Sequence, residues 1–191
     1  MIKYARITTA AALLASLASA AVILEENFDG AKFPPTGWEK VQVRGTWTRE
    51  NVGAPYNWCA YFHSYGYVGG TGTLRTKGQD LTAVEHAVSF VYRYRADPGS
   101  GTTSAESRVE RLESEGEWSV VSSWPLPKRS AFQLYEFKHA ASVAGTYRLL
   151  FYADAAQEAI VFFRLDNVTW ESGPFTAVAP ASLGRVKALY Y

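Results

Sequence analysis

Two stretches at opposite ends of the sequence carry the side chains best suited to bind a metal ion. Asp166 and Asn167 interrupt the apolar stretch AIVFFRLDNVTW near the C-terminus. The stretch ILEENFDG near the N-terminus supplies Glu25, Glu26 and Asp29. Calcium takes six to eight oxygen ligands, among which carboxylate and amide oxygens are common. If the first and last strands of the fold are neighbours, these residues can form a calcium site although they are far apart in sequence.

Strand geometry limits which of these acids can act together. Adjacent residues of a strand point to opposite faces, so Glu26 can join Asp166, or else Glu25 can do so with Asn27. We expect calcium to bind to Glu26 and Asp166, with Glu25, Asp29 and Asn167 as further ligands. The alternative is that these are solvated charges that keep a terminal strand from aggregating.

The most distinctive stretch in composition is YNWCAYFHSYGY, residues 56–67. Exposed flat rings beside polar groups can hold sugar rings or proline-rich peptides. The candidate ligand-binding residues are Tyr56, Trp58, Tyr61, Tyr65 and Tyr67. The alternative is that Trp58, Phe62 and one face of the tyrosines fill the core, because alternating aromatic residues in a strand usually pack.

The sequence offers little for catalysis. A carboxylate pair for glycoside hydrolysis could come from Glu106, Glu110, Glu113, Glu115 or Glu117, but Arg108 and Arg111 lie among them and indicate a salt-bridged surface. There is no Gly-x-Ser-x-Gly, His-Glu-x-x-His or phosphate-loop motif. The single cysteine, Cys59, cannot form an internal disulfide, and beside Trp58 it is expected to be an inert core residue. We therefore expect no enzymatic activity.

Composition and the N-terminal residues indicate an exported protein. Residues 1–20 combine Lys3 and Arg6 with a short apolar run and the cleavage pattern Ala18-Ser19-Ala20, which is typical of a signal peptide. Its removal takes two of the 19 Lys and Arg residues and none of the 18 Asp and Glu, which leaves a net charge of −1. That balance argues against nucleic-acid binding, and no apolar run is long enough to span a membrane. We expect a secreted, extracellular or cell-surface protein.

The remaining sequence predicts an all-β fold. Val88, Phe90, Tyr92 and Tyr94 alternate with polar residues, as in a strand with one buried face. No apolar stripe of helical period is sustained after the signal peptide. Strands are expected over 22–28, 38–43, 46–52, 56–67, 73–81, 84–95, 108–113, 117–123, 132–139, 146–152 and 159–170, with a loop over 97–104. The pattern predicts an antiparallel sandwich or barrel in one domain, residues 21–173, followed by a tail, residues 174–191.

Several core residues can be predicted from these strands. The interior is expected to contain Trp38, Val41, Val43, Trp47, Trp118, Phe132, Leu134 and Phe137. A fold of this length without disulfides must be stabilised by its core, with a metal ion as a possible addition.

Five motifs occur in the order seen in a known family. They are ILEENFDGAKFPPTGWEKV, GTLRTKGQDLT, VSFVYRYRAD, VERLESEGEWSVV and YRLLFYADAAQEAIVFFRLDNVTW. In this order they resemble the choice-of-anchor J domain, a family related to the cleaved-adhesin and MAM-like jelly rolls. The family pattern matches Pro35-Thr36-Gly37-Trp38 and Leu165-Asp166-Asn167-Val168, although it often has a second acid where this chain has Asn167.

The resemblance implies an antiparallel jelly-roll β-sandwich of the concanavalin or galactose-binding kind. It also implies an extracellular, non-catalytic role in adhesion or binding, with a structural calcium ion in several relatives. We expect the partner to be an extracellular protein or glycan. Two alternatives remain, a carbohydrate-binding module that uses residues 56–67 and a structural subunit that assembles through strand edges or through the tail.

Overall fold

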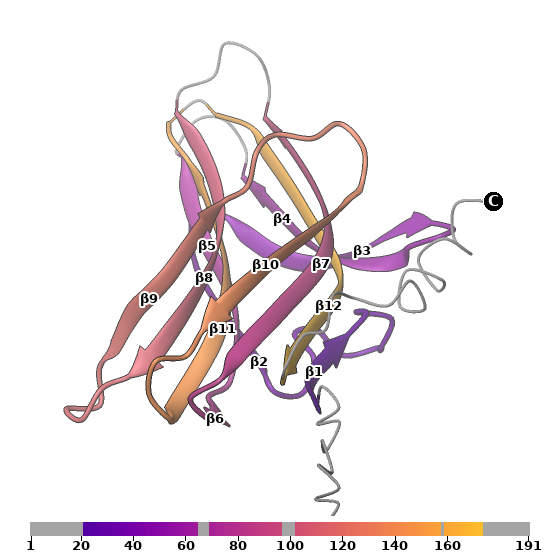
Figure 1. Ribbon diagram of the computed structural model, residues 1–191. Helices are drawn as coiled ribbons and strands as arrows, with labels where there is room; N and C mark the ends of the chain where they lie inside the picture. Colours follow the sequence, from indigo (N-terminus) through magenta and orange to yellow (C-terminus); the bar gives the residue numbers. More distant parts are fainter. Residues whose placement is uncertain (1–20, 65–68, 97–101, 158, 174–191) are drawn as a thin grey trace, which may run out of the picture.

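The chain folds into two stacked β-sheets, described by a computed structural model for residues 21–64, 69–96, 102–157 and 159–173 (Figure 1). Sheet A consists of β1 (Ala21–Glu26), β3 (Thr46–Gly53), β4 (Asn57–Ser64), β7 (Glu85–Ala96), β10 (Gln133–Ala140) and β12 (Val161–Ser172). Sheet B consists of β2 (Trp38–Val43), β5 (Gly70–Thr76), β6 (Gln79–Leu81), β8 (Thr103–Leu112), β9 (Trp118–Pro125) and β11 (Gly145–Ala155). The prediction of an all-β, antiparallel jelly-roll sandwich in a single domain is confirmed.

The longest strands lie in the middle of each sheet. The order in sheet A is β10-β7-β12-β4-β3, with β1 paired to β12, and the order in sheet B is β2-β5-β11-β8-β9, with β6 paired to β11. All of the paired strands run antiparallel. Strands β7 and β12 pair from Val161–Ala96 to Ser172–His86, so the two strongest strand patterns in the sequence form the centre of sheet A.

The core lies between the sheets and is rich in aromatic rings. The alternation in β7 holds, because Val88, Phe90, Tyr92 and Tyr94 are all buried. The ring of Phe90 meets that of Phe151 on β11 edge to face, with the centroids 4.9 Å apart. This contact joins the two sheets at the middle of the sandwich, where burying large rings contributes most to stability.

At one point the sheets approach each other closely enough to require glycine. A Cβ atom on Gly72 of β5 would lie 2.3 Å from the Phe62 ring and 2.8 Å from Trp47 Nε1. Trp47 and Phe62 are fully buried and lie on β3 and β4 of the opposite sheet. The absence of a side chain on Gly72 therefore makes room for the aromatic core.

One edge of the sandwich is closed by contacts between β9 and β10, the edge strands of the two sheets. The rings of Trp124 and Phe137 stack with their centroids 3.7 Å apart. Two residues away in each strand, Ser122 Oγ and His139 Nδ1 are hydrogen-bonded at 2.9 Å. His139 pairs with His86 in the neighbouring strand β7, and both imidazoles are buried.

The prediction that Val41 and Val43 lie in the core is wrong, because both are exposed. Trp38 is buried, and residues at odd offsets from it in the same strand must point to the other side. The inner side of β2 instead presents Lys40 and Gln42, which hydrogen-bond to the backbone of Trp47.

Three further expectations of burial are also wrong. Trp118 is half-buried on the outer side of sheet B, where its ring lies 4.0 Å from the guanidinium of Arg148. Phe132 and Leu134 are half-buried on the outer side of sheet A. The burial of Phe137 is confirmed, because β10 turns it and its alternate neighbours inward.

The predicted boundaries are tested only in part. The loop expected over 97–104 is shorter at its C-terminal end, because β8 begins at Thr103. The predicted signal peptide (1–20) and tail (174–191) lie outside the described residues and stay predictions.

Candidate functional site

The first and last strands are neighbours, as the metal-site prediction requires. Strand β1 pairs with β12 with Glu25 opposite Thr169 and Glu26 opposite Val168. A β-bulge separates Asp166 from Thr169 in the pairing of β12 with β7, and Asn167 in that bulge has a φ of 49°. A bulge turns side chains away from the regular alternation, and bulges often occur beside functional sites.

An acidic cluster, formed by Glu26, Asp29 and Asp166, lies at this bulge. Asp166 is only 2% exposed, and its Oδ1 accepts a hydrogen bond of 2.8 Å from the Asn167 backbone N–H. Burial raises the pKa of Asp166 to about 8, and the charges of Asp29 and Glu26 add to the effect. Burial also raises the pKa of Glu26, although its Oε1 accepts a 2.7 Å hydrogen bond from the Phe28 backbone N–H. The three carboxylates therefore interact electrostatically across 140 residues of sequence.

The predicted metal ligands are thus only partly assembled. Glu25 is exposed and lies opposite Thr169, while Asn167 is half-buried and donates its backbone N–H to Asp166. Asp29 is exposed at the rim of the cluster, and its Oδ1 lies 3.4 Å from the Trp58 backbone N. Within the described part of the chain, no group of three or more His, Cys, Asp or Glu side chains is close enough together to hold a metal ion as it stands.

The outer face of sheet A, the side turned away from sheet B, is curved inward. Cys59, Val91 and Asp166 leave the sheet on this side, yet they are at most 2% exposed. The rings of Tyr56, between β3 and β4, and Phe132, just before β10, are 4.2 Å apart. In the strand order β12 and β7 lie between these two segments, so the segments rise on either side of β12 and β7 and meet above them. The outer face of sheet A is therefore concave, and the residues in its middle, Cys59, Val91 and Asp166, are covered by neighbouring side chains.

The aromatic stretch is divided between the core and this concave face. Phe62 is fully buried between the sheets. Tyr61 lies on the outer face but is only 8% exposed, and its ring is parallel to that of Phe162 of β12, with an angle of 11° and centroids 6.3 Å apart. The half-buried Trp58 lies 4.1 Å from the guanidinium of Arg49. Tyr65 and Tyr67 lie outside the described residues. Alternate residues of the stretch therefore point to the core and to the outer face, and ligand binding by this stretch stays a prediction.

Cys59 behaves as expected for a structural residue. It is a free thiol with no exposed surface. Burial raises its pKa to about 12, so the thiol stays protonated and unreactive in the folded protein.

Three arginines on the same face were not predicted as functional residues. This arginine cluster consists of Arg93 and Arg95 on β7 and Arg164 on β12. Arg93 lies directly opposite Arg164, and Arg95 lies opposite Phe162. The sequence showed Arg93 and Arg95 on one side of a strand, but the pairing that adds Arg164 could not be read from it.

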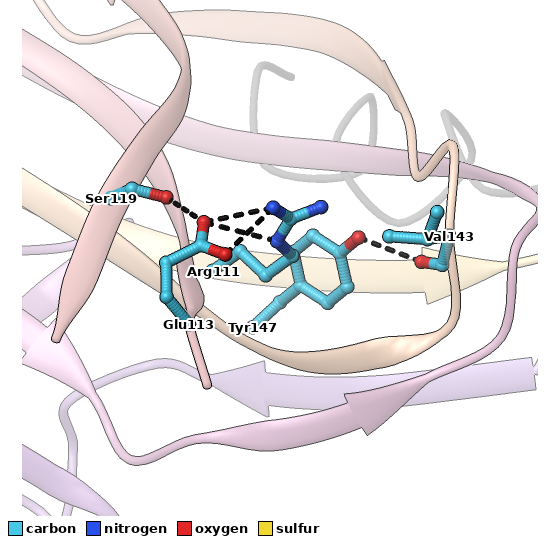
Figure 2. Close-up of polar contacts among 5 residues, drawn as sticks. All are labelled: Arg111, Glu113, Ser119, Val143 and Tyr147. Atoms are coloured by element: carbon cyan, nitrogen blue, oxygen red, sulfur yellow. Dashed lines mark hydrogen bonds and ion pairs between the residues drawn. The ribbon is translucent and has the colours of Figure 1, made fainter. Parts of the chain in front are cut away.

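Three of the five glutamates considered for catalysis form ion pairs on sheet B. Glu106 is paired with Arg108, and Glu110 with Arg148 at 2.5 Å. Figure 2 shows Glu113 facing the Arg111 guanidinium, with a shortest distance of 2.8 Å, while Ser119 donates a hydrogen bond to the same carboxylate. In the same view the Tyr147 hydroxyl donates a 2.7 Å hydrogen bond to the Val143 carbonyl. These ion pairs agree with the interpretation of the glutamates as a salt-bridged surface.

The comparisons with known proteins identify the fold and assign no family. The sequence matches no known family model and none of the curated proteins compared with it. Solved structures do resemble the chain. The xylan-binding domain from Paenibacillus barcinonensis has a TM-score of 0.55 and 11% identity over 81% of this chain and 96% of that domain. The cleaved adhesin domain of Lys-gingipain from Porphyromonas gingivalis has a TM-score of 0.52 and 15% identity over 81% and 99%.

A third similar structure is the enzymatically active domain of tailspike protein 4 from bacteriophage CBA120. Its TM-score is 0.51 at 15% identity, but the match covers 71% of this chain and only 19% of that one. At such identities the likeness shows the fold alone, a β-sandwich similar to carbohydrate-binding modules and a cleaved adhesin domain. Among the described residues there is no helix long and apolar enough to cross a membrane.

Proposed function

We propose that this protein is a secreted, non-catalytic module that attaches to glycans through the concave outer face of sheet A. The observation that carries the proposal is the half-buried ring of Phe162, which lies parallel to the ring of the buried Tyr61 on an inward-curved sheet face. Aromatic faces of this kind stack against the apolar faces of sugar rings. Support also comes from the likeness, over 81% of this chain, to a xylan-binding domain and to a cleaved adhesin domain.

A glycan array with matched variants tests this proposal. Phe162→Ala removes one ring from the outer face of sheet A and is expected to weaken glycan binding by about three- to tenfold, the usual contribution of one aromatic contact. Trp118→Ala is the control, because Trp118 is also half-buried but lies on the outer face of sheet B. Circular dichroism checks that both variants are folded.

Two results would contradict the proposal. One is the absence of binding to any glycan, which would favour adhesion to an extracellular protein instead. The other is an equal loss of binding in both variants.

The other alternative, a structural subunit, is tested by size-exclusion chromatography. Such a subunit would elute as an assembly, and shortening the chain after Gly173 would dissociate it if the tail holds it together.

We further propose that calcium binds at the acidic cluster and stabilises the joined terminal strands. The chemistry of the donors fits, because Glu26, Asp29 and Asp166 offer carboxylate oxygens and calcium prefers oxygen ligands. The buried Asp166 carboxyl is unfavourable when ionised, as its raised pKa indicates, and a divalent cation would offset that cost. These three residues would hold the ion, and Asn167 and Glu25 are adjacent to them.

Thermal unfolding with and without chelator tests the calcium site. EDTA is expected to lower the melting temperature of the wild-type protein, and excess calcium to restore it. Asp166→Asn should abolish this response, whereas Asp80→Asn, which changes an exposed side chain bonded to Thr146, should retain it. A melting temperature that is the same in chelator and in calcium would refute calcium binding.

A further inference from the structure

The arginine cluster on the outer face of sheet A has more positive charge than its surroundings neutralise. Arg93 and Arg164 are directly opposite each other on β7 and β12, an arrangement in which like charges destabilise a sheet. Glu50 of β3 accepts two hydrogen bonds from one edge of the Arg164 guanidinium, with distances of 2.5 Å to Nε and 3.0 Å to Nη2. The carboxylate of Glu50 is therefore already engaged by one of the three arginines.

Arg93 carries a buried N–H that has no acceptor. Its Nε is buried without a hydrogen-bond partner. Burial lowers the pKa of Arg93, the charges of Arg164 and Arg95 lower it further, and Glu50 opposes the shift. A buried guanidinium N–H without an acceptor is costly, and an anion placed against it would remove the cost.

Further cations lie beside this cluster. A hollow of about 340 Å³ at the end of β7 is lined by Arg95, Lys128 and Arg129, together with Tyr94, Ala96 and Ser130. The Arg129 backbone N–H donates a 2.7 Å hydrogen bond to the Tyr94 carbonyl, which fixes the segment before β10 against β7. Arg95 belongs both to this hollow and to the arginine cluster, so the two form one continuous basic surface.

The same surface adjoins the two parallel rings. Phe162 lies opposite Arg95 on β7, and the guanidinium of Arg164 lies 4.6 Å from the Tyr61 ring. A planar guanidinium binds carboxylates and sulfates through paired hydrogen bonds, whereas the half-buried Phe162 ring suits the apolar face of a sugar. An anionic group carried on a sugar ring would use both features at once.

We propose that the arginine cluster and the adjoining hollow bind the acidic groups of a glycan chain, either the carboxylates of uronic acids or sulfate esters. The inference rests on the proposed glycan-binding function and adds the chemical class of the ligand. A nucleic acid would also be attracted to arginines, but the chain without residues 1–20 has a net charge of −1 and lacks the general basic character of such proteins.

Titration calorimetry with the full chain tests this inference. The probes are polygalacturonate for carboxylates, dextran sulfate for sulfates, xylan as a neutral glycan and single-stranded DNA as an unrelated polyanion. The acidic glycan that matches the site is expected to bind more tightly than xylan, and raising NaCl from about 50 to about 500 mM should weaken its binding. The comparison of polygalacturonate with dextran sulfate shows which acidic group is recognised.

Matched arginine variants locate the binding. Arg95→Gln changes an exposed residue, so it should remain folded, and it is expected to reduce affinity for the acidic glycan about tenfold or more. Arg75→Gln, which breaks an exposed pair with Glu39 on sheet B, removes the same charge elsewhere and should leave binding unchanged. Arg93→Lys keeps the charge but loses the planar fork, so it should weaken binding to carboxylates.

The outcomes separate this inference from the function on which it rests. If xylan binds as well as the acidic glycans and Arg95→Gln has no effect, the module binds glycans but the inference is wrong. If no glycan binds, the proposed function fails as well. Binding to DNA that equals binding to the acidic glycans, or an equal loss in Arg75→Gln, would show general attraction to polyanions and would also overturn the inference.

Discussion

Replacing Asp166 by asparagine should change the way in which the stability of the protein depends on pH. Asparagine keeps the size of the side chain and an oxygen that can accept the hydrogen bond from the Asn167 N–H, but it cannot ionise. The Asp166 carboxyl has a pKa of about 8 in the folded protein, against 3.8 for an ordinary aspartate. Since one pKa unit corresponds to about 1.4 kcal/mol, the difference amounts to roughly 5 to 6 kcal/mol.

The direction of the pH dependence follows because the folded protein holds the Asp166 proton more tightly than the unfolded chain does. The folded protein keeps the Asp166 proton at pH values at which the unfolded chain has already released it. Protonation therefore stabilises the fold fully below about pH 4, and this stabilisation is lost as the pH rises to about 8. Within that window wild-type stability should fall, relative to Asp166→Asn, by about 1.4 kcal/mol per pH unit.

Urea unfolding followed by tryptophan fluorescence, in EDTA, measures this slope. Between about pH 5 and pH 7.5 the wild-type protein should lose roughly 3 kcal/mol relative to Asp166→Asn. The difference between the two proteins cancels the contributions of groups that both contain, and Asp80→Asn should follow the wild type. If the wild-type and Asp166→Asn profiles are parallel, Asp166 is not the buried, protonated carboxyl that the structure indicates. Excess calcium should flatten the wild-type slope, because a bound cation favours the ionised carboxylate.

Two further predictions concern the core and its closed edge. Gly72→Ala should destabilise the fold by roughly 1 to 3 kcal/mol, because the new Cβ would overlap Phe62. Gly30→Ala is the control, since its Cβ meets no atom within 4 Å and should change the unfolding free energy little. Equal effects of the two substitutions would contradict the close approach of the sheets. Burial and the nearby His86 lower the pKa of His139, so the unfolded chain binds a proton more readily and stability should fall as the pH drops below about 6.5. His139→Gln should reduce this acid sensitivity in urea titrations at about pH 5 and pH 7, and an unchanged difference between the two pH values would count against a role for this histidine.

The strands, and which side of each strand is buried, could be predicted wherever large apolar residues alternate regularly with polar ones. Val88, Phe90, Tyr92 and Tyr94 are large apolar residues at every second position, and their burial follows directly. Val41 is hydrophobic, but the strict period of two that begins at the buried Trp38 places it on the exposed side of β2. On an edge strand such as β2, an apolar residue can remain exposed without a large cost, so composition is a weak guide there.

For the site, only the contacts that follow from the order of the strands could be predicted. Pairing of the first and last strands brought Glu26 close to Asp166, which the sequence suggested. The meeting of Arg93 with Arg164 depends on the register of β7 against β12, and that register includes a bulge after Asp166. A bulge moves every later residue by one position, and no residue type near Asn167 indicates it unambiguously. The closure of Tyr56 onto Phe132 depends on the curvature of the whole sheet, which no local pattern contains.

The pairing of β1 with β12 also determines how the module can be attached to other structures. Ala21 and Ser172 are direct partners, so whatever is joined to either end of the sandwich leaves from the same edge. The arginine cluster lies near the other end of β12, where Phe162 pairs with Arg95. At about 3.3 Å per residue, the stretch from Phe162 to Ser172 spans roughly 30 Å. A neighbouring domain or a surface anchor could thus hold the sandwich by its two ends while the basic face stays free to meet a glycan.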